Sequence, residues 1–86
     1  MGNETVSVRS TIEMLVHAAT GRSSRWHAEN NIIDVFDVEY NQHEAMTKKL
    51  NEVRPAIVKN AEGSVTFLFH NKVESKRLQN PRMANV

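Results

Sequence analysis

The chain of 86 residues is 40% hydrophobic and 24% charged, ordinary values for one globular domain. It contains no cysteine, which excludes a disulfide scaffold, a thiolate metal site and a cysteine nucleophile, so we expect a cytoplasmic protein. The net charge is +1, and no apolar run approaches the roughly 18 residues of a membrane span, so we expect no association with membranes.

The first helix is predicted to begin at Ser10, because Ser10 followed by Glu13 forms a capping-box pattern. Apolar residues then recur at helical spacing up to Gly21, a residue that suits a helix C-terminus. We expect residues 1–9 to form an N-terminal arm. The single tryptophan, Trp26, is predicted to be a buried anchor because its ring has a large apolar area.

Residues 31–40 permit two structures, a helix or a strand. With helical spacing, the apolar residues line one side while Asp34 and Asp37 point outward. With strand alternation, Asp34 interrupts an otherwise apolar face, although the β-branched residues favour a strand. We predict the helix, and the alternative is an α+β fold with a strand at 31–40.

A further helix is predicted over residues 42–54 and ends before Pro55, because the residue that precedes a proline resists the helical conformation. Two strands are predicted within residues 56–70, joined by the loop Asn60–Gly63 as a β-hairpin. Residues 72–86 are predicted to be a basic C-terminal tail that includes a short helix. The predicted fold is therefore mainly α, a single domain over residues 10–71 with a C-terminal β-hairpin.

This order of elements resembles the winged helix-turn-helix superfamily of DNA-binding domains. Three stretches carry the resemblance, namely STIEMLVHAATG, IIDVFDVEYNQHEAMTKKLNEV and AIVKNAEGSVTFLF. The resemblance implies a winged-helix-like fold in which helix 42–54 enters the major groove of duplex DNA and the 56–70 hairpin is the wing. It also implies a role in regulating or organising DNA. A single module of this size covers little DNA, so we expect a homodimer.

The resemblance implies two sets of DNA-binding residues. Outward side chains of the recognition helix would contact bases, since Gln and Asn can pair with adenine and Arg or Lys with guanine. These base-reading candidates are Gln42, His43, Thr47, Lys48, Asn51 and Arg54. Other basic and polar residues would contact phosphates, which adds affinity without sequence information. These phosphate candidates are Arg22, Arg25, Lys59, Asn60, Lys72, Lys76 and Arg77.

The uneven distribution of charge suggests an alternative function. Residues 26–44 contain five acidic residues and no Lys or Arg, whereas residues 45–86 contain eight basic and three acidic residues, a net charge of +5. Such asymmetry indicates charged partners. The alternative is a protein–protein interaction module, such as an inhibitor or an antitoxin-like adaptor. It would use the acidic 26–44 surface, with Asp34, Asp37 and Glu39 in contact with the partner.

The sequence contains no complete catalytic or metal-binding motif. Its four histidines form no H-x-x-x-H pair, so no helix presents two imidazoles to one ion. A G-x-S-x-G nucleophile elbow and a phosphate-binding P-loop are both missing. We therefore expect no enzymatic activity, no bound metal and no cofactor.

Overall fold

The computed structural model describes residues 2–79, with side chains from residue 7 onward. This range forms a small α+β domain of three helices and a three-stranded mixed sheet. The alternative with a strand at 31–40 is confirmed, and the predicted helix there is wrong. The strands are not confined to the C-terminal part of the chain, because two of the three described strands precede the longest internal helix.

Helix α1 spans Gly2–Thr20, so residues 2–9 belong to it and do not form a separate arm. Ser10 lies inside the helix rather than at its start. Glu13 does not cap the helix, because its Oε2 accepts a hydrogen bond from the backbone N–H of Trp26 at 3.0 Å. The helix ends where predicted, at Gly21, whose φ of 70° is a left-handed conformation that glycine adopts easily.

Strands β1 (Ser24–His27) and β2 (Ile32–Val35) form an antiparallel hairpin in which Trp26 lies opposite Ile33. Trp26 is buried in the core, as predicted. Its indole N–H donates to Asn31 Oδ1 in the turn at 3.0 Å, which satisfies the ring's one polar group. The hairpin is therefore fixed by apolar packing and by a side-chain hydrogen bond at its turn.

Helix α2 (His43–Ala61) follows a 3₁₀ turn, η1 (Tyr40–Gln42). Pro55 lies within α2, and the prediction that it ends the helix is wrong. A proline removes one hydrogen bond of a helix, but Leu50 and Ile57 are fully buried on either side of it and hold the helix against the core. Residues 56–61 are consequently helical, and the predicted 56–70 hairpin does not form.

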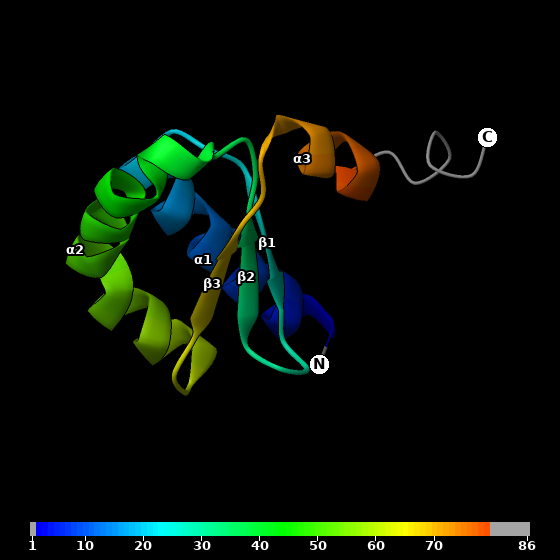
Figure 1. Ribbon diagram of the computed structural model, residues 1–86. Coiled ribbons are helices and arrows are strands. Elements are labelled where there is room, and N and C mark those ends of the chain that lie inside the picture. Colours follow the sequence, from blue (N-terminus) through cyan, green and yellow to red (C-terminus); the bar gives the residue numbers. More distant parts are fainter. Residues whose placement is uncertain (1, 80–86) are drawn as a thin grey trace.

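Strand β3 (Thr66–Phe69) pairs in parallel with β2, so the sheet order is β1-β2-β3 and both β1 and β3 are edge strands. Helix α3 (Lys72–Gln79) lies at one end of the sheet (Figure 1). It contacts the ends of other strands, since Ser75 Oγ accepts from Asp37 N at 2.8 Å and Gln79 donates to Ser23 Oγ at 3.3 Å. The predicted short helix of the tail is thus confirmed, and residues 80–86 lie outside the described range.

Helices α1 and α2 pack against each other and against one face of the sheet. The buried cluster between them contains Ile12, Val16, Trp26, Ile33, Val35, Val38, Met46, Leu50, Ile57 and Val65. Because side chains alternate along a strand, the strand residues that lie between the buried ones point to the opposite face of the sheet. We call this face, which presents Arg25, His27, Ile32, Asp34, Thr66 and Leu68, the open face. No helix within residues 2–79 combines the length and apolarity needed to cross a membrane.

Candidate functional site

Three ionisable residues meet on the open face, where we define the His–Asp–His cluster as His27, Asp34 and His70. His27 ends β1, Asp34 lies in β2, and His70 directly follows β3. One oxygen of the Asp34 carboxylate accepts a hydrogen bond from His27 Nε2 at 2.7 Å, and the other accepts from His70 Nε2 at 2.8 Å. The Asp34 and His70 side chains are only 16% and 17% exposed. The cluster therefore joins all three strands on one face.

The pKa of Asp34 lies below its ordinary value. Burial by itself raises the pKa of this carboxyl, but hydrogen bonds from His70 and His27 and the attraction of their positive charge outweigh burial. An ionised carboxylate can only accept hydrogen bonds, so each imidazole donates through Nε2–H. Both rings therefore present Nε2–H to Asp34, and both Nδ1 atoms are directed away from it.

Packing restrains the rings of the cluster further. Phe36 stacks on His70 with ring centroids 5.7 Å apart, and Phe36 is buried outside the main core. His27 Nδ1 lies 3.6 Å from Glu29 Oε2 at the exposed end of the hairpin. Imidazoles oriented by a carboxylate can take up or release a proton. Within the described residues, no group of three His, Cys, Asp or Glu side chains is arranged to hold a metal ion.

Most base-reading candidates make contacts within the protein. Gln42 Oε1 accepts from Glu39 N at 3.0 Å, as part of the cap of the 3₁₀ turn. Arg54 donates to Asn51 Oδ1 at 2.9 Å and to the Val65 carbonyl at 3.3 Å. These bonds hold the side chains against their own fold, so they are not free to contact bases without rearrangement.

The remaining base-reading candidates differ in exposure. His43 is half-buried between Tyr40 and Phe69, with ring centroids at 5.4 and 4.8 Å. Thr47 and Lys48 are exposed on the outer side of α2, where Lys48 Nζ lies 3.9 Å from Glu44. Of the six base-reading candidates, Thr47 and Lys48 are the two that are exposed and make no hydrogen bond to another part of the described fold.

Most phosphate candidates separate into two groups. Lys59 and Asn60 lie at the C-terminal end of α2, where Asn60 donates to the Ala56 carbonyl at 2.8 Å. A second group lies on or beside α3, at the other end of the molecule (Figure 1). The members of this second group are Arg22, Lys72, Lys76 and Arg77, whereas Arg25 lies in β1 and lines a hollow with Arg9 and Glu13 of α1. Arg22 belongs to the second group because its Nε donates to the Asp37 carbonyl at 2.9 Å, beside the contact of Ser75.

The acidic residues of the alternative function do not all face solvent freely. Asp34 belongs to the His–Asp–His cluster. Glu39 Oε2 accepts the N–H of Lys72 at 2.9 Å and so caps the start of α3. Asp37 is exposed in a tight bend after β2, with a φ of 59°. Two of the three side chains therefore have structural partners, and Asp37 is the one turned to solvent.

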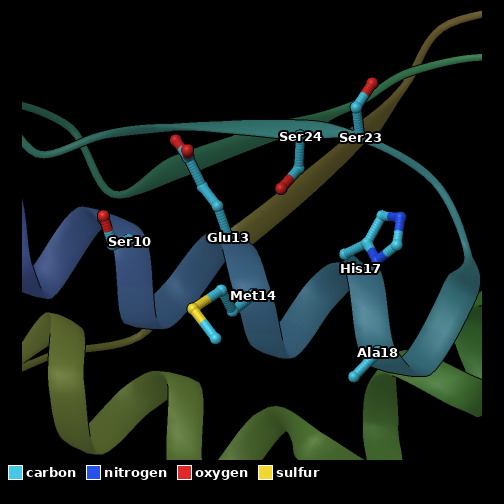
Figure 2. A pocket seen from close by; sticks show the side chains of 7 residues that line it. All are labelled: Ser10, Glu13, Met14, His17, Ala18, Ser23 and Ser24. Atoms are coloured by element: carbon cyan, nitrogen blue, oxygen red, sulfur yellow. The ribbon is translucent and has the colours of Figure 1, made fainter.

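The edge of β1 is closed by a side chain from α1. A groove of about 560 Å³ runs between the two elements and is lined by Ser10, Glu13, Met14, His17, Ala18, Ser23 and Ser24 (Figure 2). Glu13 extends from α1 toward β1 and accepts the Trp26 N–H that would otherwise point out of the sheet. Ser24 Oγ is buried without a hydrogen-bond partner in the described structure. A carboxylate placed in this way protects an edge strand from pairing.

At the edge of β3, Arg54 donates to the Val65 carbonyl just before the strand, but no described side chain is hydrogen-bonded to the backbone of Phe67 or Phe69. Thr66 N donates to Asn31 O and His70 N to Val35 O, both at 3.0 Å, so the even-numbered residues of this segment bond to β2. Backbone groups alternate along a strand, and those of Phe67 and Phe69 therefore point away from the sheet. The strand contains no charge and no proline, and Leu68 is 42% exposed. We call Thr66–Phe69, with these outward backbone groups, the β3 edge.

Aromatic and cationic side chains surround the β3 edge. The Arg54 guanidinium lies over the Phe67 ring at 4.8 Å, and His43 packs on Phe69. Tyr40, which packs on His43, is 87% exposed. Tyr, Phe and Arg are the residue types enriched in the centres of protein interfaces.

No protein-family model, curated protein or solved structure matches this chain. The winged-helix resemblance therefore rests on the quoted sequence stretches alone. The two elements on which its DNA-binding role depended, a helix ending at residue 54 and a hairpin over 56–70, are absent from residues 2–79.

Sequence reasoning missed both the His–Asp–His cluster and the β3 edge. For the cluster, the available signal was position, because His27, Asp34 and His70 each lie in or beside a β-branched or aromatic run that can form a strand. For the edge, the signal was TFLF itself, an uncharged apolar run whose partner strands were not identified.

Proposed function

We propose that this protein is an interaction module that binds an extended polypeptide segment by adding it to the β3 edge. The observation that carries the proposal is the difference between the two edges of the sheet. Glu13 accepts the outward N–H of Trp26 on β1, whereas the outward groups of Phe67 and Phe69 on β3 face away from β2. Exposed edges are normally blocked by charges, prolines or bulges, and an edge kept open is a natural site for strand addition.

Strand addition would obtain affinity from the backbone and selectivity from the side chains. Four backbone groups, the N–H and C=O of Phe67 and Phe69, supply hydrogen bonds whatever the sequence of the added strand. Leu68 supplies an apolar contact on the open face. Arg54 lies over Phe67 and His43 packs on Phe69, so both would stand beside the side chains of the occupant.

Duplex-DNA binding is the second candidate, and one observation favours it. Four basic residues, Arg22, Lys72, Lys76 and Arg77, lie on or beside α3 at one end of the sheet. Cations gathered in this way could contact consecutive phosphates. The acidic residues Asp37 and Glu74 lie in the same region, which reduces the local positive potential.

A synthetic peptide of alternating valine and threonine, with one Glu and one Lys at its ends, tests strand addition without a known partner. We expect it to slow hydrogen exchange of the Phe67 and Phe69 amides in dilute protein. Leu68→Lys should weaken binding about tenfold, because a charge would enter the apolar pairing surface. Leu78→Lys is the matched control, since Leu78 is exposed to a similar extent on α3, and it should change nothing.

Two results would overturn the proposal: no protection of the Phe67 and Phe69 amides, or equal binding by the Leu68→Lys variant. Random-sequence duplex DNA in a salt series is the parallel arm. If the protein binds DNA, the logarithm of the binding constant should fall with the logarithm of the salt concentration, with a slope near −0.9 per phosphate contacted. Such binding would support the second candidate instead if Leu68→Lys leaves it unchanged and Arg77→Ala weakens it.

A further inference from the structure

We infer that the segment occupying the β3 edge is β3 of a second copy of this chain, running antiparallel with Leu68 of both copies on the two-fold axis. The inference rests on the strand-adding function proposed above and names its partner. A two-fold pairing of this kind is isologous, so the same patch must be complementary to itself. The hydrogen bonds, side chains and charges of β3 each meet that requirement.

Hydrogen bonding selects the register. In an antiparallel pair, two residues exchange both hydrogen bonds only when both present their backbone groups to the partner. On β3 those residues are Phe67 and Phe69. Pairing Phe67 with Phe69 of the second copy, and Phe69 with its Phe67, uses every outward backbone group of both strands.

The neighbouring two-fold registers compete with hydrogen bonds already made. Placing Phe67 opposite its own copy brings Val65 opposite Phe69, but the Val65 carbonyl accepts from Arg54 at 3.3 Å. Placing Phe69 opposite its own copy brings Asn71 opposite Phe67, but the Asn71 N–H donates to Glu74 Oε1 at 3.0 Å. The first alternative makes the added strand share the Val65 carbonyl with Arg54, and the second breaks the bond from Asn71 to Glu74. In the register centred on Leu68, the outward groups of Phe67 and Phe69 pair with one another and need neither Val65 nor Asn71.

Side chains on both faces of the strand fit the same register. On the open face, Leu68 meets Leu68 of the second copy in a non-hydrogen-bonded pair, the closer kind, with Cα atoms about 4.5 Å apart. On the helix-covered face, Phe67 meets Phe69 of the second copy, and aromatic cross-strand pairs are favourable. The exposed apolar surface of Leu68 is thereby covered by an identical surface.

Charge does not oppose self-pairing. Thr66–Phe69 contains no charged residue, so a second copy brings no like charges into opposition along the strand. The Arg54 guanidinium, which lies over Phe67, would also stand beside Phe69 of the second copy, where a ring face attracts a cation.

The pairing creates a continuous sheet across two copies and one long open face. Thr66 of one copy lies opposite His70 of the other, because the register that pairs the two Leu68 residues also pairs these positions. The two His–Asp–His clusters therefore flank the two-fold axis, and each is adjacent to a hydroxyl group from the other copy.

Cysteine crosslinking of the full chain tests the register. The protein has no cysteine, so Leu68→Cys introduces the only thiol, and the Cα separation of about 4.5 Å on the axis allows a disulfide. We expect Leu68→Cys to form a covalent dimer about a hundredfold faster than Leu78→Cys at micromolar protein, because pairing raises the effective thiol concentration to the millimolar range. Leu78 is 46% exposed against 42% for Leu68, which makes it a matched control.

Thr66→Cys distinguishes the register, since Thr66 faces His70 and not itself, and it should crosslink no faster than the control. Equal rates for Leu68→Cys and Leu78→Cys, or a faster rate for Thr66→Cys, would overturn the inference. If the valine–threonine peptide still protects the Phe67 and Phe69 amides in that case, the strand-adding function stands and its partner is a different chain. If the peptide also fails, both proposals fail.

Discussion

His70 Nε2 lies 2.8 Å from Asp34 Oδ1, although the two residues are 36 positions apart in the chain. The contact joins the end of β3 to the centre of β2, and the second oxygen of Asp34 extends the connection to His27 on β1. Parallel strands such as β2 and β3 have no hairpin turn to hold them together. A polar contact of this type therefore stabilises the long-range pairing that defines the fold.

Asp34→Asn should lower the free energy of unfolding at pH 7 by about 1–3 kcal/mol. The amide keeps the size of the side chain but replaces one acceptor oxygen with a donor group, which then faces an imidazole N–H. Urea denaturation followed by Trp26 fluorescence measures the loss. Asp37→Asn is the control, because Asp37 is exposed, and an equal loss in both variants would contradict a specific role for the cluster.

The contribution of Asp34 should depend on pH in a defined direction. Its pKa is lowered in the folded state, so its stabilising effect is fully present above the unfolded value near 3.8 and is lost as pH falls through the folded value. The stability difference between the natural protein and Asp34→Asn should therefore narrow below about pH 4. A difference that stays constant from pH 7 to pH 3 would show that ionisation of Asp34 does not contribute.

Ile33→Ala and Ile32→Ala should differ strongly in stability. Ile33 is fully buried beneath α1 and α2, so its truncation should cost about 2–5 kcal/mol, whereas Ile32 lies on the open face and should cost about 1 kcal/mol or less. Urea denaturation of both variants measures the two costs. Similar costs would contradict the alternation of β2, since a helix at 31–40 would bury both side chains on the same apolar stripe.

A comparison of residues 21–26 with residues 31–40 shows why the sequence predicted some features and not others. Local pattern was sufficient for Gly21 at the end of α1 and for Trp26 in the core, because each depends on its own chemistry. It was insufficient at residues 31–40, where Asp34 appeared to spoil a strand. The partners that make Asp34 acceptable on a sheet, His27 and His70, come from two other strands, and no local window contains both.

The C-terminal half was mispredicted for a related reason. Pro55 is a strong local stop signal, but burial of Leu50 and Ile57 on either side holds the helix together past it. Continuation of α2 to Ala61 removed the first strand of the expected hairpin. The apolar run at 65–69 was correctly identified as a strand, and its partner turned out to be β2 rather than residues 56–59.

Glu13→Ala should lower the free energy of unfolding by about 1–2 kcal/mol, because it leaves the Trp26 N–H without its acceptor at the edge of β1. Glu13→Gln keeps an amide oxygen in the same place and should retain most of the stability. Fluorescence of the single Trp26 during urea denaturation reports both effects. Equal stability of the alanine and glutamine variants would show that the hydrogen bond from Trp26 to Glu13 does not stabilise the fold.

Glu13→Ala should also increase association at the β1 edge, since the carboxylate is what blocks pairing there. We expect more light scattering at equal protein concentration than for Glu13→Gln, and a second region of amide protection, at Ser24 and Trp26, when the valine–threonine peptide is added. Protection confined to Phe67 and Phe69 in both variants would mean that α1 itself, and not its carboxylate, closes this edge.

Pro55→Ala should raise the free energy of unfolding by about 1–2 kcal/mol. Alanine restores a backbone N–H that can donate to the Asn51 carbonyl, at an exposed position where no packing is lost, and the gain exceeds the entropy that a proline removes from the unfolded chain. Urea denaturation measures the gain, and hydrogen exchange at residue 55 reports the new bond. Lys59→Ala, another exposed position on α2, controls for helix propensity alone and should change stability by no more than about 0.5 kcal/mol. An equal gain in both variants would show that the missing hydrogen bond at Pro55 costs α2 nothing.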